Sequence, residues 1–265
     1  MSTYVMTDIH GCFKKMNGML EKINLTNNDK LIIAGDYIDR GPQSYEMLRW
    51  LESKPENVVL LRGNHDEEFA YCIDLLYGLV KKEGMVIDSY SDTCLAYEMM
   101  VVLTGQKDSS IKFFDHYGTI AHLIYEYEVT LQKMVEWKDL IRKMPFVYKG
   151  EISSKQYVVV HAGYIESLDE VELEEEYGSL EEFYIYARDD AYMFGGIKDG
   201  IVIAGHTPTI FQEELPYNYG KVYMSYDEEL NCKFYNIDCG CAYGKEGFET
   251  SLACIRIDDE EIFYV

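Results

Sequence analysis

The chain has 265 residues and no run of 18 apolar ones, which predicts that it has no transmembrane helix. It is also poor in basic residues. Its 24 Lys and Arg stand against 47 Asp and Glu, and the formal net charge is −23. Such a charge repels nucleic acid and anionic membranes, so we expect neither as a general partner. A local positive site remains possible in an acidic protein that binds cations.

The seven cysteines include no CxxC pair and are scattered along the chain. This pattern indicates free thiols in a reducing compartment rather than a disulfide framework. The N-terminus lacks the basic segment of a signal peptide, and cleavage there would remove Asp8 and His10. We therefore expect a cytoplasmic protein. The sequence does not indicate its oligomeric state.

The first seventy residues contain three units, each a short apolar strand, a loop and an amphipathic helix. The expected strands are Thr3–Met6, Leu31–Ala34 and Val58–Leu61, and the third helix runs from about Glu67 to Lys81. Strands that alternate with helices predict a largely parallel sheet with helices on its faces. The fold class is therefore α/β.

The rest of the chain differs in pattern. Residues 82–150 are helical in periodicity and read as an insertion or cap within a single domain, 1–265. Strands resume at Tyr157–Val160 and Ile201–Ala204, and the chain from Lys221 onward reads as all β. This tail suggests a second sheet, so a central β-sandwich flanked by helices is expected.

Six short motifs place metal-binding or phosphate-binding residue types at the ends of apolar runs. They also hold His10, His65, His161 and His206, four of the six histidines. Cores avoid Asp, Asn and Arg unless these are paired or bind metal, so packing does not explain the pattern. It predicts one site for two cations and a phosphate, built from TDIHG (Thr7–Gly11), GDYIDRGP (Gly35–Pro42), RGNHDE (Arg62–Glu67), VVHAG (Val159–Gly163), ARDD (Ala187–Asp190) and AGHTP (Ala204–Pro208).

The first two motifs predict the ligands of one cation. In extended geometry Asp8 and His10 would point to the same side and share that cation. Asp36 has two carboxylate oxygens and can bridge two cations about 3.5–4 Å apart. Alone, the Asp8–His10 pair would as often be a surface Asp beside a hydrogen-bonded His.

The second cation would take the amide oxygen of Asn64, the bridging Asp36 and the imidazoles of His161 and His206. Either histidine alone would more often be a buried structural residue. Together they complete a mixed set of nitrogen and oxygen ligands, which suits Mn, Fe or Zn better than Ca or Mg.

His65 adjoins Asn64 but cannot easily bind the same ion, so it is a candidate general acid for a leaving oxygen. Asp39 would hold its ring. Arg40 is expected to clamp a phosphate, and Arg62 and Arg188 are further phosphate candidates. The alternatives are an Asp39–Arg40 ion pair at a helix start and a surface salt bridge at Arg188.

In residue pattern and in order, these motifs resemble those of the phosphoprotein phosphatase family of metallophosphoesterases, whose pattern is GDxHG, GDxxDRG, GNHE, HAG and GH. NIDCGCAYG (Asn236–Gly244) also looks like that family, so the resemblance spans most of the chain. It implies a calcineurin-like fold, a dinuclear Mn or Fe/Zn centre and direct attack on phosphorus by a metal-bridging hydroxide. It also implies the roles given above for Asp8, His10, Asp36, Asn64, His161 and His206 as ligands, His65 and Asp39 as the acid pair, and Arg40, Arg62 and Arg188 as phosphate binders.

The chain departs from the family pattern at two positions. Thr7 replaces a glycine, a small change in a tight turn, and Asp66 stands where the family has Glu, which resembles the dinucleotide hydrolases. Those hydrolases often lack the aspartate of DRG, which is present here as Asp39. The sequence thus favours a bacterial or phage-type serine/threonine protein phosphatase modestly over a symmetrical dinucleoside tetraphosphate hydrolase.

The remaining alternative is a catalytically inactive scaffold protein with this fold. Its sequence signature would be the loss of one metal-binding residue or of His65. The acidic stretch 166–182 reads as a solvated face, with a charged lip that selects substrates as its alternative.

Overall fold

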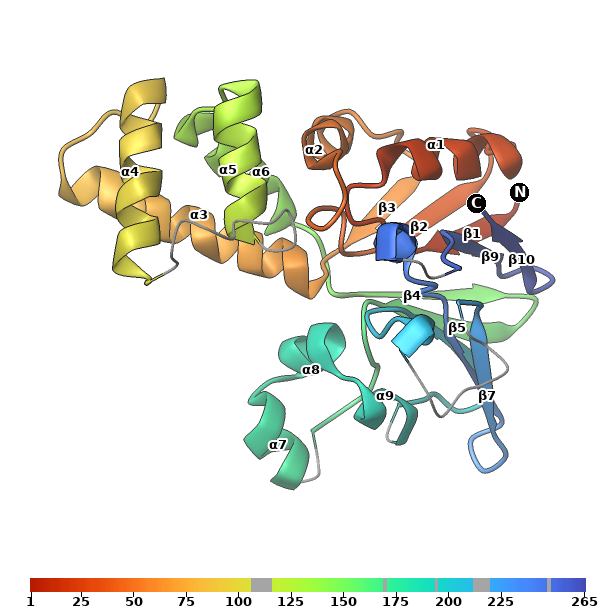
Figure 1. Cartoon of the computed structure of the whole chain (residues 1–265). Coiled ribbons are helices and arrows are strands. Elements are labelled where there is room, and N and C mark those ends of the chain that lie inside the picture. Colours follow the sequence, from red (N-terminus) through yellow and green to blue (C-terminus); the bar gives the residue numbers. More distant parts are fainter. Residues whose placement is uncertain (106–115, 169–170, 194, 212–219, 247–248) are drawn as a thin grey trace.

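The structure is a computed structural model that describes residues 1–105, 116–168, 171–193, 195–211, 220–246 and 249–265. Two five-stranded mixed sheets face each other at its centre (Figure 1). The first has the order β10-β9-β1-β2-β3 and the second β4-β5-β6-β8-β7. The strands are β1 (Thr3–Met6), β2 (Lys30–Ala34), β3 (Val58–Leu61), β4 (Val147–Ile152), β5 (Lys155–Val160), β6 (Gly200–Ala204), β7 (Tyr223–Asp227), β8 (Cys232–Asn236), β9 (Ala253–Arg256) and β10 (Glu261–Tyr264).

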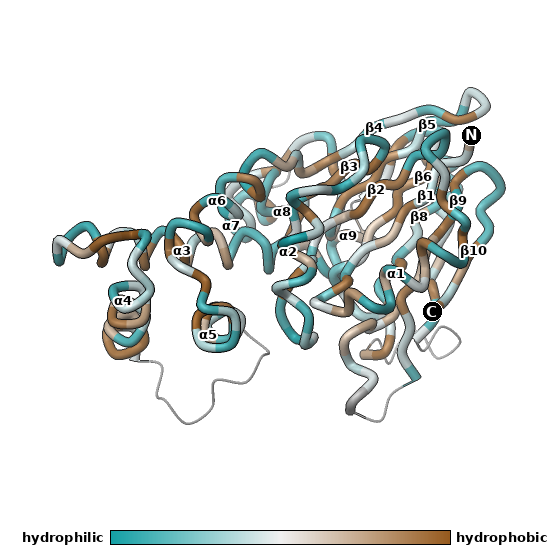
Figure 2. Tube along the Cα trace, turned by 90° about the horizontal axis from the view of Figure 1, so that it is seen from above, coloured by the Kyte–Doolittle hydropathy of each residue, from teal (hydrophilic) through white to brown (hydrophobic). Residues whose placement is uncertain are grey.

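Strands β1, β2 and β3 run parallel, as do β5, β6 and β8, while the outer strands pair antiparallel. Successive residues of β1 and β2 point to opposite faces of the sheet. Val5 and Ile32 pack between the sheets against Val159 and Ile203 of the second sheet. Both faces of these strands are buried, which explains why they read as continuous apolar runs. Figure 2 shows hydrophobic residues along these strands, which lie on the side of the molecule opposite to α4 and α5.

Helices cover the outer face of each sheet. The first sheet carries α1 (Phe13–Lys22), α2 (Ser44–Glu52) and α3 (Asn64–Lys82), and α3 extends away from the sheets to support α4 (Tyr90–Leu103), α5 (His116–Tyr127) and α6 (Leu131–Ile141) (Figure 1). The second sheet carries α7 (Val171–Tyr177), α8 (Leu180–Tyr186) and α9 (Asp189–Met193). The short 3₁₀ helices η1 (Thr209–Phe211) and η2 (Cys241–Glu246) lie in loops.

The predicted α/β fold with two mixed sheets flanked by helices is confirmed, and three details were wrong. The C-terminal strands do not form a sheet of their own, because β9 and β10 extend the first sheet beside β1 while β7 and β8 join the second. Helix α3 begins at Asn64, so the GNHDE motif forms its first turn rather than a loop. Strand β4 starts inside the segment read as helical and forms an edge of the second sheet.

Residues of the insertion share a hydrophobic cluster with the sheet helices. Met16 of α1, Phe69 of α3, Leu123 of α5 and Met134 of α6 are fully buried in it. The organisation of the chain as a single domain stays a prediction. Within the described ranges, no helix is both long and apolar enough to cross a membrane.

Candidate metal centre

The motif loops meet at one edge of the sandwich. They follow β1, β2 and β3 in the first sheet and β5 and β6 in the second, and in each sheet these strands are parallel. Their carboxyl ends therefore lie on one side, where open α/β sheets bind ligands. His161 joins the two sheets there, because its Nδ1 lies 2.8 Å from the carbonyl oxygen of Ala34.

The backbone of these loops is unusual. Residues with positive φ include Asp8 (51°), His10 (46°), Asp36 (55°) and His206 (68°). L-residues seldom adopt this left-handed region, and such strain concentrates at functional sites. Asp8 and His10 follow β1 as expected, but the expectation that they have extended geometry was wrong, because β1 ends at Met6 and both residues have positive φ. Their side chains converge through left-handed turns instead.

Two glycines allow the backbone to approach the carboxylates. A Cβ at Gly63 would lie 2.3 Å from Oδ1 of Asp36, and one at Gly205 would lie 2.1 Å from Oδ2 of Asp8. Without those Cβ atoms, the amide of His65 donates to Asp36 Oδ1 at 3.0 Å, and the amide of His206 donates to Asp8 Oδ2 at 3.0 Å. Glycine is therefore required at both positions to hold the carboxylates in place.

Asp36 lies between two histidines. Its Oδ2 is 3.3 Å from Nε2 of His10, and its Oδ1 is 3.5 Å from Nε2 of His161. The Nδ1 atoms of both rings face backbone carbonyls, of Ile38 and Ala34, at 2.9 and 2.8 Å. A carbonyl only accepts, so Nδ1 carries the hydrogen and Nε2 keeps a lone pair for a cation. Asp8 Oδ1 lies 3.7 Å from His10 Nε2.

Asn64 is the centre of the second group. Its Oδ1 lies 3.0 Å from His161 Nε2 and 3.0 Å from Nδ1 of His206. The histidines therefore direct nitrogen atoms at the same amide oxygen, with Asp36 beside them. The structure thus brings together all six residues expected to bind metal, as two groups that share Asp36. Their roles as ligands stay a prediction.

The charge balance of this site fits cations. Burial, with the neighbouring Asp36 charge, raises the pKa of the Asp8 carboxyl, and burial and the Asp8 charge raise the pKa of Asp238 well above its ordinary value. Burial also lowers the pKa values of His10 and His206, so both imidazoles are neutral at pH 7. Neutral imidazoles and crowded buried carboxylates are the donor set that divalent cations require.

Buried polar atoms without hydrogen-bond partners also indicate a cation site. Among the described residues, Oδ1 of Asp8 and Nε2 of His206 are buried and have no hydrogen-bond partner. Buried polar atoms are rarely left in this state, and the ability to bind an ion is one of the usual reasons. The residues present therefore fit two divalent cations.

His65 and Asp39 form the expected pair. His65 Nδ1 lies 2.7 Å from Asp39 Oδ2, and the Asp39 side chain is fully buried. Burial opposes a charged imidazole, but the charges of Asp36 and Asp39 outweigh it and raise the pKa of His65. The guanidinium of Arg40 lies 2.5 Å from Nε2 of His10 and 2.8 Å from Nε2 of His65. Arg40 therefore reaches the space between the His65–Asp39 pair and the residues expected to bind metal.

The other two arginines are placed differently. Arg62 donates to Glu67 at 2.8 Å and to the carbonyl oxygens of Arg142 and Met144, so its described contacts hold the insertion against α3. Arg188 is exposed and lies 3.4 Å from the hydroxyl of Thr207, next to His206.

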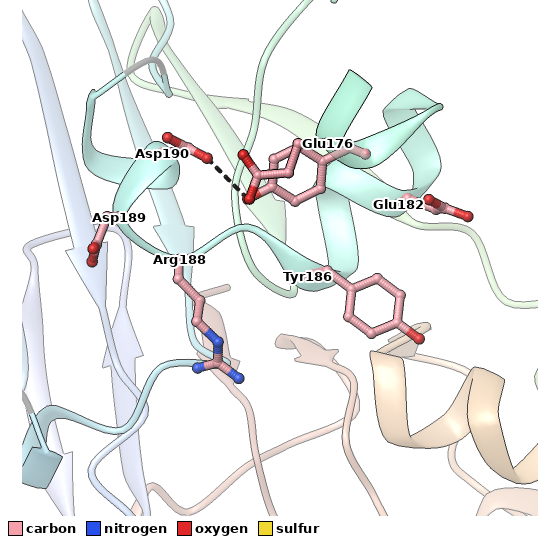
Figure 3. A pocket seen from close by; sticks show the side chains of 7 residues that line it. Glu176, Glu182, Tyr186, Arg188, Asp189 and Asp190 are labelled. Carbon is pink, nitrogen blue, oxygen red and sulfur yellow. Dashed lines mark hydrogen bonds between the residues drawn. The ribbon is translucent and has the colours of Figure 1, made fainter. Parts of the chain in front are cut away.

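Arg188 also lines a pocket of about 560 Å³ beside the site (Figure 3). Its walls include Glu176 and Glu182 of the acidic stretch, together with Asp189 and Asp190. Glu176 and Glu182 are exposed to solvent, as a solvated face predicts, and they also border this pocket. The Arg188 side chain extends away from these carboxylates in the view of Figure 3.

Several residues near the site were not foreseen from the sequence. His116 of α5 contacts Asp39, with Nδ1 2.7 Å from Oδ2, and also contacts Glu68 of α3. Neither belongs to a recognisable pattern, since a lone His in a helix is common. Asp66, noted only as a family departure, accepts hydrogen bonds from the amides of Asp36, Tyr37 and Gly63 and thereby holds the β2 loop to the start of α3.

Comparison with known proteins gives the family. The sequence profile of calcineurin-like phosphoesterases matches residues 1–244. The chain is similar to the symmetrical bis(5'-nucleosyl)-tetraphosphatases of Buchnera aphidicola (49% identity over 67 residues; 25% of this chain and 24% of that protein) and Vibrio parahaemolyticus (38% over 84 residues; 31% and 30%). The matched segments thus span less than a third of either relative.

A crystal structure provisionally assigned as a diadenosine tetraphosphatase shares the fold. Its TM-score is 0.53 at 15% identity, and the match covers 99% of this chain and 92% of that one. The profile covers all five strand-end loops that build the metal centre. The chain therefore belongs to the calcineurin-like phosphoesterase family.

Proposed function

We propose that this chain is a metal-dependent phosphoester hydrolase and that it cleaves dinucleoside tetraphosphates symmetrically. One observation carries the hydrolase assignment. Six metal-binding side chains from five separated loops converge at one edge of the sandwich, two of their atoms lack partners, and an arginine and a histidine–aspartate pair lie beside them. The ligands are Asp8, His10, Asp36, Asn64, His161 and His206.

The ligand set would hold two cations. Asp36 directs one oxygen toward His10 and the other toward His161, so it is placed to join the two groups. Two divalent cations held there supply the positive charge that activates water and neutralises the phosphoryl oxygens. Imidazole, carboxylate and amide ligands together suit Mn, Fe or Zn.

The chain's own residues would handle the phosphate and the leaving group. Arg40 presents two guanidinium nitrogens to the space above His10 and His65, where they can bind phosphoryl oxygens as a fork. Once Arg40 engages a phosphate, Nε2 of His65 is free to carry a proton to the departing oxygen. Asp39 accepts from the other ring nitrogen and keeps the imidazole oriented.

The substrate assignment rests on the curated relatives, which are named symmetrical dinucleoside tetraphosphatases. Symmetrical cleavage adds the oxygen of one water to a central phosphorus and breaks its bond to the bridging oxygen, which gives two nucleoside diphosphates. The sequence alone had favoured a phosphoserine or phosphothreonine phosphatase. The relatives support the dinucleotide alternative better.

Protein phosphatase activity remains the second candidate because of Asp39. A nucleoside diphosphate is a good leaving group that gains little from protonation, whereas a serine alkoxide depends on a proton, and a buried His65–Asp39 pair is suited to supply one. The pair is thus the feature that favours poor leaving groups.

A substrate panel tests both. Metal-reconstituted protein is offered diadenosine tetraphosphate, a phosphoserine peptide and para-nitrophenyl phosphate, and the products are separated by chromatography. We expect ADP as the sole nucleotide product and the highest kcat/KM for the dinucleotide. Preference for the phosphopeptide would assign the second candidate. No turnover of any of the three, with metals bound, would refute the hydrolase assignment.

A further inference from the structure

The insertion contributes a second histidine to the acid pair. His116, the first residue of α5, places Nδ1 2.7 Å from Oδ2 of Asp39. The same oxygen lies 2.7 Å from Nδ1 of His65. The centroids of the two imidazole rings are 5.2 Å apart, and the His116 side chain is only 13% exposed. One carboxylate oxygen therefore serves two imidazoles, one from a motif and one from the insertion.

The other face of His116 meets Glu68. Nε2 contacts Oε2 of Glu68, so both ring nitrogens face carboxylates and both must carry hydrogens. Burial opposes this charged form, but the hydrogen bonds to Asp39 and Glu68 outweigh it and raise the pKa of His116 to about 10. Oε1 of Glu68 in turn accepts from the hydroxyl of Tyr186 in α8 at 3.1 Å. A continuous hydrogen-bonded chain thus runs from Asp39 through α5 and α3 to α8.

Asp39 has a particular need for these contacts. It sits in a loop at φ 69°, and its carboxylate turns about a soft torsion that has no sharp preferred angle. A single hydrogen bond from His65 would leave that rotation open. His116 contacts Oδ2 and Thr119, one turn further along α5, contacts Oδ1, so donors on both oxygens fix the carboxylate plane.

We propose that His116 is a positioning residue of this hydrolase, which holds the Asp39 carboxylate so that His65 presents Nε2 to the leaving oxygen. The inference rests on the proposed phosphoester hydrolysis. It gives the helical insertion a chemical task, because α5 delivers to the site a side chain that the motif loops do not contain.

The first test measures rates for aryl esters whose phenols differ in leaving ability, as esters of phosphate and, in parallel, of the β-phosphate of ADP. Removal of a residue that supports a site residue typically costs about 10–100-fold. We expect His116→Ala to lose roughly that much for the poorest leaving group and about threefold or less for para-nitrophenol, whose phenolate needs little protonation. His122→Asn is the matched control on the same helix, and it should follow wild type across the series.

A double-mutant cycle separates positioning from general destabilisation. If His116 acts through His65, adding His116→Ala to His65→Asn should cost little more rate, whereas independent effects would multiply. His116→Gln retains an amide donor and should recover part of the loss. A uniform rate loss across the series, or multiplying losses in the cycle, would overturn the inference while the hydrolase assignment stands.

The last readout does not involve activity. In the metal-free protein at pH 8, ¹⁵N NMR should show His116 with both ring nitrogens protonated, because each faces a carboxylate. A neutral His116 would contradict the hydrogen-bond chain. Asp39, His65 and His116 also lie close enough to hold an ion. If wild type binds three metals per chain and His116→Ala binds two, the cluster is a metal site and the inference is wrong. Absence of turnover in wild type would instead remove the proposed function.

Discussion

The loops at the edge of the sandwich and the helical insertion both place a histidine on Asp39, but they do so by different means. His65 is positioned by the backbone around it. Its amide donates a hydrogen bond to Asp36, and the preceding Gly63 has no Cβ that would clash with that carboxylate. His116 is positioned by the burial of Ile120 and Leu123, which seat α5. A site residue held by local backbone leaves a sequence motif, whereas one delivered by packing leaves none.

Metal removal should have the largest effect on activity. We expect it to change only the loops that hold the ligands. We expect exhaustive chelation to abolish activity and Mn²⁺ to restore it best, because the ligands mix nitrogen and oxygen donors. Activity and elemental analysis are measured on the same samples, and the insertion should stay folded by circular dichroism. Full activity in protein that contains no metal would contradict this prediction.

The next largest effect is expected for Asp36→Asn, which should lose more bound metal than His10→Gln. Asp36 faces both ligand groups and its charge offsets both cations, whereas His10 belongs to one group. We expect metal content by elemental analysis to fall toward zero in the first variant and toward one ion per chain in the second. If Asp36→Asn kept two tightly bound ions, Asp36 would not bridge.

His65→Asn should retain both metals and the fold but lose rate. General acid catalysis contributes about 10²–10⁴-fold, so kcat for a seryl phosphate should fall by roughly that factor. The loss should be smaller for para-nitrophenyl phosphate, whose phenolate leaves unaided, and Asp39→Asn should show the same trend more weakly. Loss of a metal, or equal slowing of both substrates, would make His65 a ligand or a phosphate binder.

Substitutions of the three arginines should have the smallest effects. They separate changes in catalysis at the loops from changes in the stability of the insertion. Arg40 lies among the site histidines, so Arg40→Lys should raise KM and lower kcat by about tenfold, the cost of one charged hydrogen bond. Arg188→Ala should change KM by only a few fold, because Arg188 is exposed.

Arg62→Lys should act on stability instead. Its guanidinium binds Glu67 and two carbonyls of the insertion, and losing part of these bonds should cost roughly 1–3 kcal/mol in denaturant unfolding. Arg40→Lys is its control, with little change in unfolding. A large loss of substrate affinity in Arg62→Lys, with stability unchanged, would restore Arg62 as a phosphate binder.

The sequence by itself determined most of the strands, the fold class and the motif residues that surround the site. Strands such as β1 and β3 are apolar on both faces, and that pattern follows from burial in any α/β fold. The loop residues could be found because each needs a local feature, such as the glycine at position 63 or a charged residue directly after a strand.

Only the tertiary structure decided which residues outside the motifs reach the centre and which partners the motif arginines contact. His116 and Glu68 lie 48 positions apart, and the contacts of His116 with both Glu68 and Asp39 depend on how α5 packs on α3. Arg62 donates to a backbone carbonyl that lies eighty positions further along the chain. Such contacts carry no local signature, because the free energy that fixes them is the non-directional burial of apolar side chains spread over several helices.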